Sequence, residues 1–378
     1  MSLIDKLSFA SRVFVKKGPL IQLTLFITSR CNLRCSHCFY WKELDSDHSH
    51  ELKIDEIQKI AKSLPRLLVL SLTGGETFVR QDIGEIYKAF VKHTRVPIVT
   101  ISTNGFYLRR MSEAIPQMLE ENPKTNLLIY LSIDGPQEIN DHIRGKDSYQ
   151  KAMDCLNMLQ PLRKKYKNLG VSISMTCNKF NEDHLKDTFL YLKDSGLVDN
   201  VNIGFVRGDP KDPAAKQNVS IEKYRELTAL KVGAIKNDDL KYFNFLLNKI
   251  VSGKDYHTYK IVEDILVNDR WVLPCQAGSL FGVLYDDGSV HPCEILDNSK
   301  LGNVRDFNYD LPKLWAAEKA TAMRDKIKDG CYCTFECALS SSILFNAKYL
   351  TKIALGTLFH KWTNAAPKPV EKTPALQR

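Results

Sequence analysis

Three cysteines near the start of the chain have the residue type and spacing most suited to chemistry. Cys31, Cys35 and Cys38 stand in the run Cys-Asn-Leu-Arg-Cys-Ser-His-Cys, just after the apolar segment 21–27. Grouped thiolates bind zinc or iron–sulfur clusters, but structural zinc needs four ligands, usually arranged as pairs. The next cysteine, Cys155, is more than a hundred residues further on. Three ligands on a four-iron cluster leave one iron open, so the triplet favours such a cluster over zinc or over three unconnected thiols.

A second group of cysteines occupies 63 residues near the C-terminus. Segment 281–293 predicts a β-hairpin that turns at Asp287-Gly288 and brings the first two cysteines of the group together. A helical pattern at 311–328 precedes the other three, so the set is Cys275, Cys293, Cys331, Cys333 and Cys337. Four thiolates complete one all-cysteine 4Fe–4S cluster and leave one over. We expect one auxiliary cluster here, with zinc as the alternative.

Six short apolar runs, separated by amphipathic helical patterns, predict the strands and helices that position Cys31, Cys35 and Cys38. They lie at 21–27, 67–72, 98–102, 127–133, 171–175 and 201–206. Rich in Val, Ile and Leu, they predict parallel strands buried on both faces and joined by right-handed crossovers. Every polar or glycine-rich motif follows a strand: Thr73-Gly-Gly-Glu76, Ser102-Thr-Asn-Gly105, Ser132-Ile-Asp-Gly135, Thr176-Cys-Asn178 and Gly204-Phe-Val-Arg207. Because ligands bind at the carboxyl ends of parallel strands, these motifs predict one site on one rim.

The spacing Cys-x3-Cys-x2-Cys, followed by a Gly-Gly-Glu motif after the second strand, resembles the radical S-adenosylmethionine (SAM) enzymes. The resemblance implies that the three cysteines hold a 4Fe–4S cluster and that SAM chelates the open iron. It implies that Gly74, Gly75 and Glu76 bind the methionine amino group. It further implies that the ribose is held by Ser102, Asn104, Ser132 and Asp134, and the SAM carboxylate by Arg144. For Arg144 the alternative is a surface ion pair.

The C-terminal pattern Cys-x12-Gly-x4-Cys is similar to the start of the SPASM or twitch extension, which carries auxiliary iron–sulfur clusters. The chain departs from the full SPASM pattern, which has seven or more cysteines. The resemblance implies a partial (β/α)6 barrel with parallel strands, followed by a small cysteine-rich α+β iron–sulfur domain. We expect an N-terminal extension at 1–20, the barrel at 21–208, and bridging helices at 209–270 with helical patterns at 223–251 and 259–267. The auxiliary-cluster domain should cover 271–340, and an amphipathic helix and tail 341–378.

What the resemblance implies for function is reductive cleavage of SAM to a 5′-deoxyadenosyl radical, which abstracts hydrogen from a peptide side chain or small metabolite. Net oxidation or rearrangement would follow with help from the auxiliary cluster, so we expect an oxidoreductase. Flavodoxin or ferredoxin would donate the electron. A non-catalytic iron–sulfur or zinc scaffold and an RNA-modifying enzyme are the alternatives. No catalytic residue beyond the cofactor ligands, no substrate and no oligomeric state is indicated.

Composition and charge limit the remaining classes of function. The chain has 378 residues, ten cysteines and a formal net charge of +9. No secretory signal and no run near the roughly 18 apolar residues of a membrane span is present, so we expect a cytoplasmic protein with reduced thiols, Cys155 and Cys177 being buried apolar residues. The basic residues are dispersed, which argues against nucleic acid as a partner. Apolar positions with interleaved lysines at 343–362 predict an amphipathic helix that docks on the protein or contacts a membrane surface.

Overall fold

The computed structural model describes residues 20–359 except 238 and 241–244. The expected N-terminal extension, apart from residue 20, therefore lies outside the described residues. So does the part of the expected tail beyond residue 359, including Lys361.

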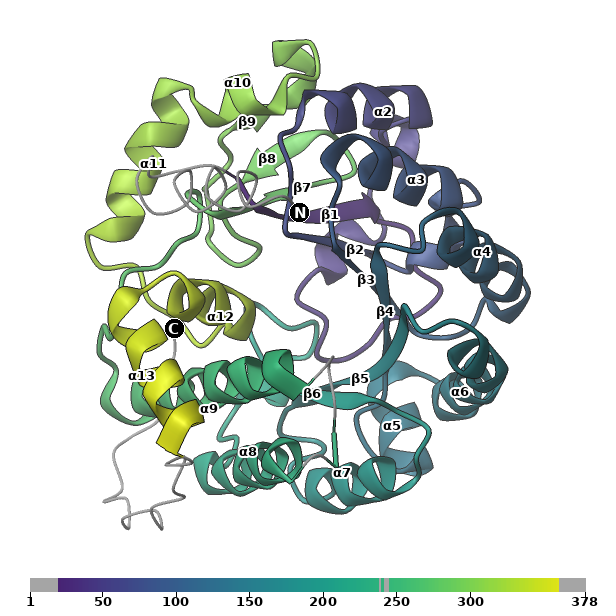
Figure 1. Cartoon of the computed structure of the whole chain (residues 1–378), viewed down its shortest axis with the longest axis vertical. Coiled ribbons are helices and arrows are strands. Elements are labelled where there is room, and N and C mark those ends of the chain that lie inside the picture. Colours follow the sequence, from purple (N-terminus) through teal and green to yellow (C-terminus); the bar gives the residue numbers. More distant parts are fainter. Residues whose placement is uncertain (1–19, 238, 241–244, 360–378) are drawn as a thin grey trace.

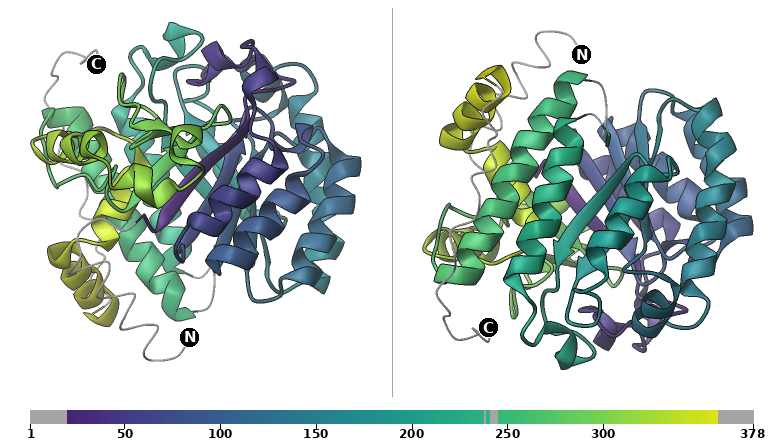
Figure 2. Two further views of the ribbon diagram at one scale, coloured as in Figure 1. Left: turned by 90° about the horizontal axis from the view of Figure 1, so that it is seen from above. Right: turned by 90° about the horizontal axis from the view of Figure 1, so that it is seen from below.

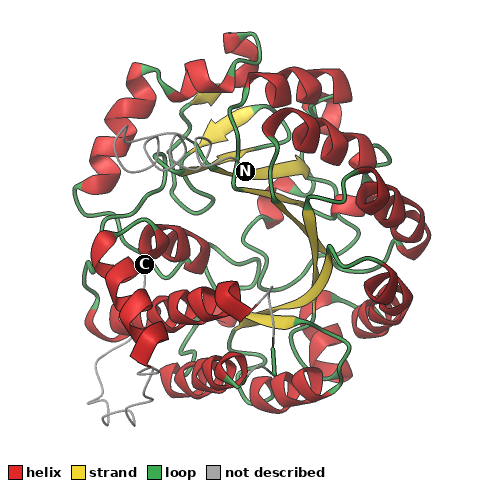
Figure 3. Cartoon of the chain, viewed as in Figure 1, coloured by secondary structure: helices red, strands yellow, loops and turns green. Residues whose placement is uncertain are grey.

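A curved sheet of parallel strands with helices along its outer face forms the body of the molecule (Figures 1 and 3). Six strands pair in chain order: β1 Gln22–Thr28, β2 Val69–Gly74, β3 Ile98–Thr103, β4 Asn126–Ser132, β5 Leu169–Cys177 and β6 Asn200–Phe205. The intervening helices are α2 Ile54–Ser63, α3 Ile83–Thr94, α4 Leu108–Glu121, α5 Gln137–Arg144, α6 Ser148–Lys165 and α7 Leu185–Asp194. Single 3-10 turns are η1 Trp41–Glu43, η2 His48–His50, η3 Thr77–Val79, η4 Pro213–Lys216 and η5 Val304–Phe307. The predicted partial α/β barrel is confirmed.

The two faces of the sheet differ in chemistry. On β4, Ile129 and Leu131 are fully buried in the main core, whereas the alternate residues Tyr130 and Ser132 remain partly exposed. On β6, Asn202 has the same partly exposed position. The expectation that the strands are buried on both faces holds for β1, in which every residue from Leu23 to Thr28 is buried, and is wrong for the inner faces of β4 and β6. Alternating side chains place polar groups on the inner face, toward the ends where the strand motifs lie.

Two long helices follow β6 and flank the open side of the barrel (Figure 2). They are α8 Ile221–Lys236 and α9 Phe245–Asn268. The predicted helical ranges, 223–251 and 259–267, placed the break between the two helices too late in the chain. The first helix ends before Asn237-Asp-Asp239, residues that favour caps and turns over helix interiors. Helix α9 instead continues through Gly253, because tertiary packing of Tyr259 and Val262 in the core outweighs local propensity.

The predicted hairpin is present but belongs to the same sheet as the barrel. Strands β7 Phe281–Leu284 and β8 Ser289–His291 are antiparallel around the expected turn, and β9 Gly302–Asn303 follows. Strand β7 also pairs in parallel with β1, which gives a continuous order β6-β5-β4-β3-β2-β1-β7-β8-β9. Helices α10 Leu311–Trp315 and α11 Glu318–Lys328 replace the single helical stretch expected at 311–328. The cysteine-rich region is thus attached directly to the strand that precedes the first cysteine triplet.

The helix expected at 343–362 is divided between two elements. Helix α12 spans Glu336–Leu344 and α13 spans Ala347–Phe359. Tyr349 and Ile353 of α13 are buried in the main core, while Lys348 and Lys352 are exposed. This packing supports a helix docked on the protein over a helix that lies on a membrane surface. Within the residues described, no helix has the length and apolar character needed to cross a bilayer.

Candidate active site

The first cysteine triplet lies on the loop that leaves β1. All three thiols are partly exposed and close together: the Cys38 N–H donates to the Cys35 carbonyl at 3.2 Å, and the Leu33 N–H donates to Cys31 Sγ at 3.4 Å. Burial raises the pKa of Cys31 to about 12, with further increases from the charges of Cys35, Glu76 and Cys38. Burial followed by the charge of Cys35 raises the pKa of Cys38 to about 11. Three thiolates at this place therefore require bound cations, which is the condition that cluster iron meets.

The arrangement of ligands bears on the choice between one ion and a cluster. Among the described residues, no three His, Cys, Asp or Glu side chains converge as ligands of a single metal ion. In a 4Fe–4S cluster each thiolate binds a different iron, so its ligands need not converge on one point.

The glycine pair after β2 is required by close approach of two backbone segments. The Gly75 N–H donates to the Thr28 carbonyl and the Glu76 N–H to the Arg30 carbonyl, both at 2.8 Å. A Cβ on Gly74, whose φ is +142°, would lie 2.1 Å from the Thr28 oxygen, and one on Gly75 would lie 2.3 Å from the Arg30 oxygen. The pair therefore lets the end of β2 join the start of the cysteine loop. This packing role was not predicted from the sequence, which indicated only approach to a ligand.

Glu76 is fixed at the centre of this junction. Its carboxylate accepts hydrogen bonds from the Thr103 hydroxyl at 2.7 Å, the Asn104 N–H at 2.7 Å and the Phe78 N–H at 3.0 Å. The side chain is 1% exposed, and burial raises the pKa of the carboxyl group. All three donors are neutral, so a cationic ligand beside Glu76 would supply the missing counter-charge. An ammonium group of the kind that SAM carries fits this position.

The rim beyond β3 and β4 contains the other expected SAM contacts. Ser102 and Ser132 are partly exposed at the ends of their strands, and the Asn104 side chain donates to Asn32 Oδ1 of the cysteine loop at 2.9 Å. Asp134 is fully buried: it accepts from the Thr176 N–H at 2.7 Å and pairs with Arg144 Nε at 2.7 Å. Arg144 is thus a buried partner of Asp134 and no surface ion pair, and its carbonyl accepts from the Cys35 thiol. We propose that Asp134 positions Arg144, in place of the direct ribose contact expected above.

A comparison with known protein families covers most of the barrel. Residues 25–192 match the radical SAM superfamily model. The chain carries a radical SAM domain. A cysteine-type anaerobic sulfatase-maturating enzyme of Clostridium novyi is 26% identical over 306 residues, covering 75% of this chain and 76% of the relative. An Fe-coproporphyrin III synthase of Methanosarcina barkeri is 24% identical over 307 residues, covering 77% and 72%.

Solved structures agree in fold. The native anSMEcpe enzyme with bound AdoMet and the Cp18Cys peptide superposes with a TM-score of 0.58 at 19% identity, covering 91% of this chain and all of that one. Radical SAM enzymes use a 4Fe–4S cluster and SAM, and the likeness in fold, which covers 91% of this chain, extends beyond residues 25–192.

Four of the five C-terminal cysteines gather beside the radical SAM domain. Cys275, Cys331 and Cys333 line one small cavity, and the Cys275 and Cys331 thiols are hydrogen-bonded. Cys293 belongs to the same apolar cluster and shares its electrostatic environment with Cys331 and Cys333. Cys337 is not in this group and is exposed, and its thiol lies among the charged groups of Arg207, Glu294 and Glu336. We therefore propose the first four as auxiliary-cluster ligands and Cys337 as the remaining thiol.

Arg207, just past β6, connects the two cysteine regions. Its guanidinium lies over the ring of Phe39, next to Cys38, at 4.9 Å and over that of Phe335 at 4.5 Å. Its Nη2 is 3.4 Å from Glu294 Oε2, beside Cys293. A cation held between two rings in this way is rigid. No role for Arg207 was predicted from the sequence, where its position at a strand end is the only signal.

His37 was also missed, although it stands between Cys35 and Cys38 in the triplet itself. Its Nε2 lies 3.7 Å from Asp134 Oδ2, and burial lowers its pKa to about 4. A neutral imidazole therefore fills the space between the cysteine loop and the Asp134–Arg144 pair. The expectation that Cys155 and Cys177 are buried apolar residues is confirmed, since both are 0% exposed.

Proposed function

We propose that the protein is a radical SAM oxidoreductase in which Cys31, Cys35 and Cys38 hold the SAM-binding 4Fe–4S cluster. The observation that carries this proposal is the buried Glu76 carboxylate, with only neutral donors, beside three thiols on one loop. When bound and reduced, such a cluster supplies the electron that cleaves SAM to methionine and a 5′-deoxyadenosyl radical. An auxiliary 4Fe–4S cluster at Cys275, Cys293, Cys331 and Cys333 would support net oxidation or rearrangement of the substrate.

The residues of this chain bind and orient SAM in the proposal. Glu76 accepts from the amino group of SAM beside Gly74 and Gly75, and Arg144 binds its carboxylate. Ser102, Asn104 and Ser132 hold the ribose. The polar inner face then receives the substrate next to SAM, within the walls formed by β4, β6 and the C-terminal cysteine region. The protein contributes to the reaction by holding SAM and the substrate at a fixed distance from each other and by excluding water.

The substrate class is a peptide side chain or a small metabolite. The anSMEcpe structure, which shares this fold, was solved with a bound peptide, and a sulfatase-maturating relative resembles this chain over three quarters of its length. The Fe-coproporphyrin III synthase relative, matched at nearly the same identity, favours the small-metabolite alternative equally. A flavodoxin or ferredoxin is the proposed electron donor, and the site is proposed to act inside the cytoplasm.

The decisive experiment is SAM cleavage by anaerobically reconstituted protein under dithionite. We expect 5′-deoxyadenosine and methionine in equal amounts. Absence of both from protein that holds its iron would favour the non-catalytic scaffold. Transfer of deuterium from a candidate compound into 5′-deoxyadenosine would then identify the substrate, and transfer from RNA alone would favour the RNA-modifying alternative.

Glu76 gives a direct test of the SAM-binding arrangement. Glu76→Gln keeps the shape of the side chain but removes its charge, so the hydrogen bond to the SAM ammonium loses its ionic character. Charge-assisted hydrogen bonds contribute roughly 1.5–3 kcal/mol, and we expect SAM binding to weaken by about one to two decades. Calorimetry on reconstituted protein measures the change, with the melting temperature and iron content as controls. An unchanged dissociation constant in a folded, iron-loaded variant would leave Glu76 with a purely structural role.

The membrane contact remains a prediction for α13. Lys348, Lys352 and Leu355 are exposed on a face adjacent to the buried Tyr349 and Ile353, and the Lys352 ammonium lies over the Tyr349 ring at 5.0 Å. Basic and apolar groups together favour anionic lipid surfaces. We expect full-length protein to float with anionic liposomes more than a variant that ends at residue 346. Equal recovery of the two would leave only the docked role.

A further inference from the structure

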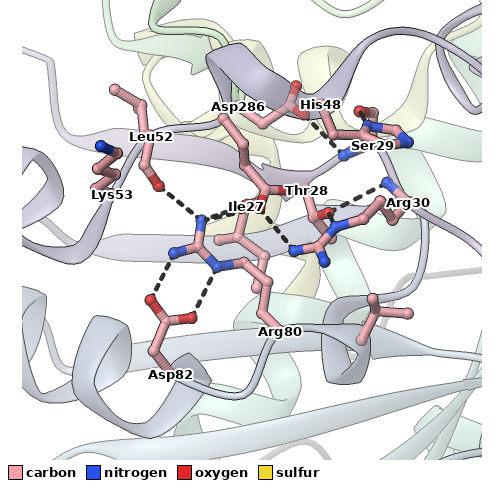
Figure 4. A network of polar contacts seen from close by, with 12 residues as sticks. Ile27, Thr28, Ser29, Arg30, His48, Leu52, Lys53, Arg80, Asp82 and Asp286 are labelled. Carbon is pink, nitrogen blue, oxygen red and sulfur yellow. Dashed lines mark hydrogen bonds and ion pairs between the residues drawn. The ribbon is translucent and has the colours of Figure 1, made fainter.

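One carboxylate of the C-terminal hairpin holds both ends of the cysteine loop. Asp286, at the turn between β7 and β8, accepts the Ser29 N–H on Oδ2 at 2.8 Å and the Tyr40 hydroxyl on Oδ1 at 3.3 Å (Figure 4 shows the Ser29 contact). Ser29 stands two residues before Cys31, and Tyr40 two residues after Cys38. The loop that carries the thiols is therefore closed at its base by a side chain more than 240 residues away in sequence.

This closure is built into the protein interior. Asp286 is 7% exposed and Tyr40 is 8% exposed. The Tyr40 ring contacts Phe26 of β1 at 4.6 Å between centroids and stacks on Tyr285 of the hairpin at 5.9 Å. Because both partners are desolvated and packed, the contact fixes distance as well as charge.

The same turn is braced to the segment that follows Glu76. The Leu52 N–H donates to the Asp286 carbonyl at 2.6 Å, and Arg80 Nη1 donates to the carbonyls of Leu52 at 2.8 Å and Ile27 at 3.0 Å (Figure 4). Arg80 is 5% exposed and is oriented by a bidentate pair with Asp82. The hairpin, the cysteine loop and the segment after Gly-Gly-Glu therefore share one network.

We propose that Asp286 is a positioning residue for SAM binding: through Ser29 and Tyr40, the hairpin that carries Cys293 sets the position of the loop with Cys31, Cys35 and Cys38. The proposal rests on the proposed function for the identity of the cluster on that loop. It assigns the C-terminal hairpin a role in the first step of the reaction, independent of the auxiliary cluster. Loss of the contact would shift the three thiols relative to Glu76, so that the two sets of residues would hold SAM less well.

The test compares Asp286→Asn with Asp287→Asn in anaerobically reconstituted protein. Asp287 is the next residue of the same turn, and its carboxylate accepts from the Ser289 N–H, away from the cysteine loop. We expect Asp286→Asn to weaken SAM binding about tenfold, as loss of one hydrogen bond to a charged group does, and to alter the change in the reduced cluster's EPR signal on SAM addition. Asp287→Asn should match the wild type. Both variants should keep the full iron content.

A second variant separates positioning from folding. Tyr40→Phe keeps the ring and its packing but removes the hydroxyl, and we expect the same EPR change with a smaller loss of affinity. Combined with Asp286→Asn it should add little, because both changes break one contact. Wild-type SAM affinity and EPR response in Asp286→Asn and Tyr40→Phe would overturn the proposal. So would equal losses in Asp287→Asn. A wild-type protein that binds no SAM would instead refute the proposed function itself.

Discussion

Replacement of Cys31, Cys35 and Cys38 together by Ala should abolish SAM cleavage while iron at the C-terminal site remains. The reason is that the three thiols are the only cysteines on the loop beside Glu76, whereas the other cysteine group lies across the Arg207 contact. Wild-type protein should hold about eight irons per chain, as two four-iron clusters require, and the triple variant about four. Iron analysis and the yield of 5′-deoxyadenosine under dithionite measure both effects.

The two readouts of the triple variant have different consequences. Retained SAM cleavage would refute the assignment of the triplet. About twelve irons in the wild type would show a further cluster, and zinc in place of iron in the variant would show that the C-terminal site is not an iron–sulfur site. Ser29→Ala is a suitable control on the same loop, because Asp286 binds the main-chain N–H of Ser29 and that contact is unchanged.

Loss of Cys275 should affect the C-terminal iron and substrate turnover but spare SAM cleavage, the reverse of what is expected for the triple variant. The Cys275→Ala variant removes a ligand from the set with Cys293, Cys331 and Cys333, so its iron content should fall to about half of the wild-type value. Turnover of substrate should be lost, while uncoupled SAM cleavage continues at the first cluster. In the proposed function the radical is generated there, and the contacts of Asp286 with Ser29 and Tyr40 do not involve Cys275. Iron analysis, product detection and 5′-deoxyadenosine yield distinguish these effects.

Cys337 provides the matched control for this variant. It lies in the same segment as Cys331 and Cys333, but its thiol faces the charged groups of Arg207, Glu294 and Glu336, and burial raises its pKa to about 11. Cys337→Ser should therefore keep all of the iron. If Cys337→Ser lost the C-terminal iron and Cys275→Ala kept it, the proposed choice of four ligands would be wrong.

The main features of the fold were accessible from sequence because they depend on local patterns. Short Val-, Ile- and Leu-rich runs separated by amphipathic stretches predicted six parallel strands, and Asp287-Gly288 predicted the hairpin turn. What local patterns could not provide was the pairing of β7 with β1, which joins strands more than 250 residues apart. The burial of the inner face was misjudged for a related reason. The run Leu128-Ile-Tyr-Leu-Ser132 is apolar enough to resemble a strand buried on both faces. Its sequence does not show that helices cover only one of the two faces.

The site divides in the same way. The order of the cysteine triplet and Gly-Gly-Glu76 along the chain by itself determined the radical SAM resemblance and its cofactors, because each motif is contiguous and follows a strand. Only the tertiary structure decided that Asp134 binds Arg144, that Cys337 stands apart from the other four C-terminal cysteines, and that Asp286 closes the loop through Ser29 and Tyr40. These arrangements join segments that lie apart in the sequence, and no periodic pattern of residues predicts which segments meet. They depend on where the sheet places each turn, and a side chain's partner is fixed only when that placement is complete.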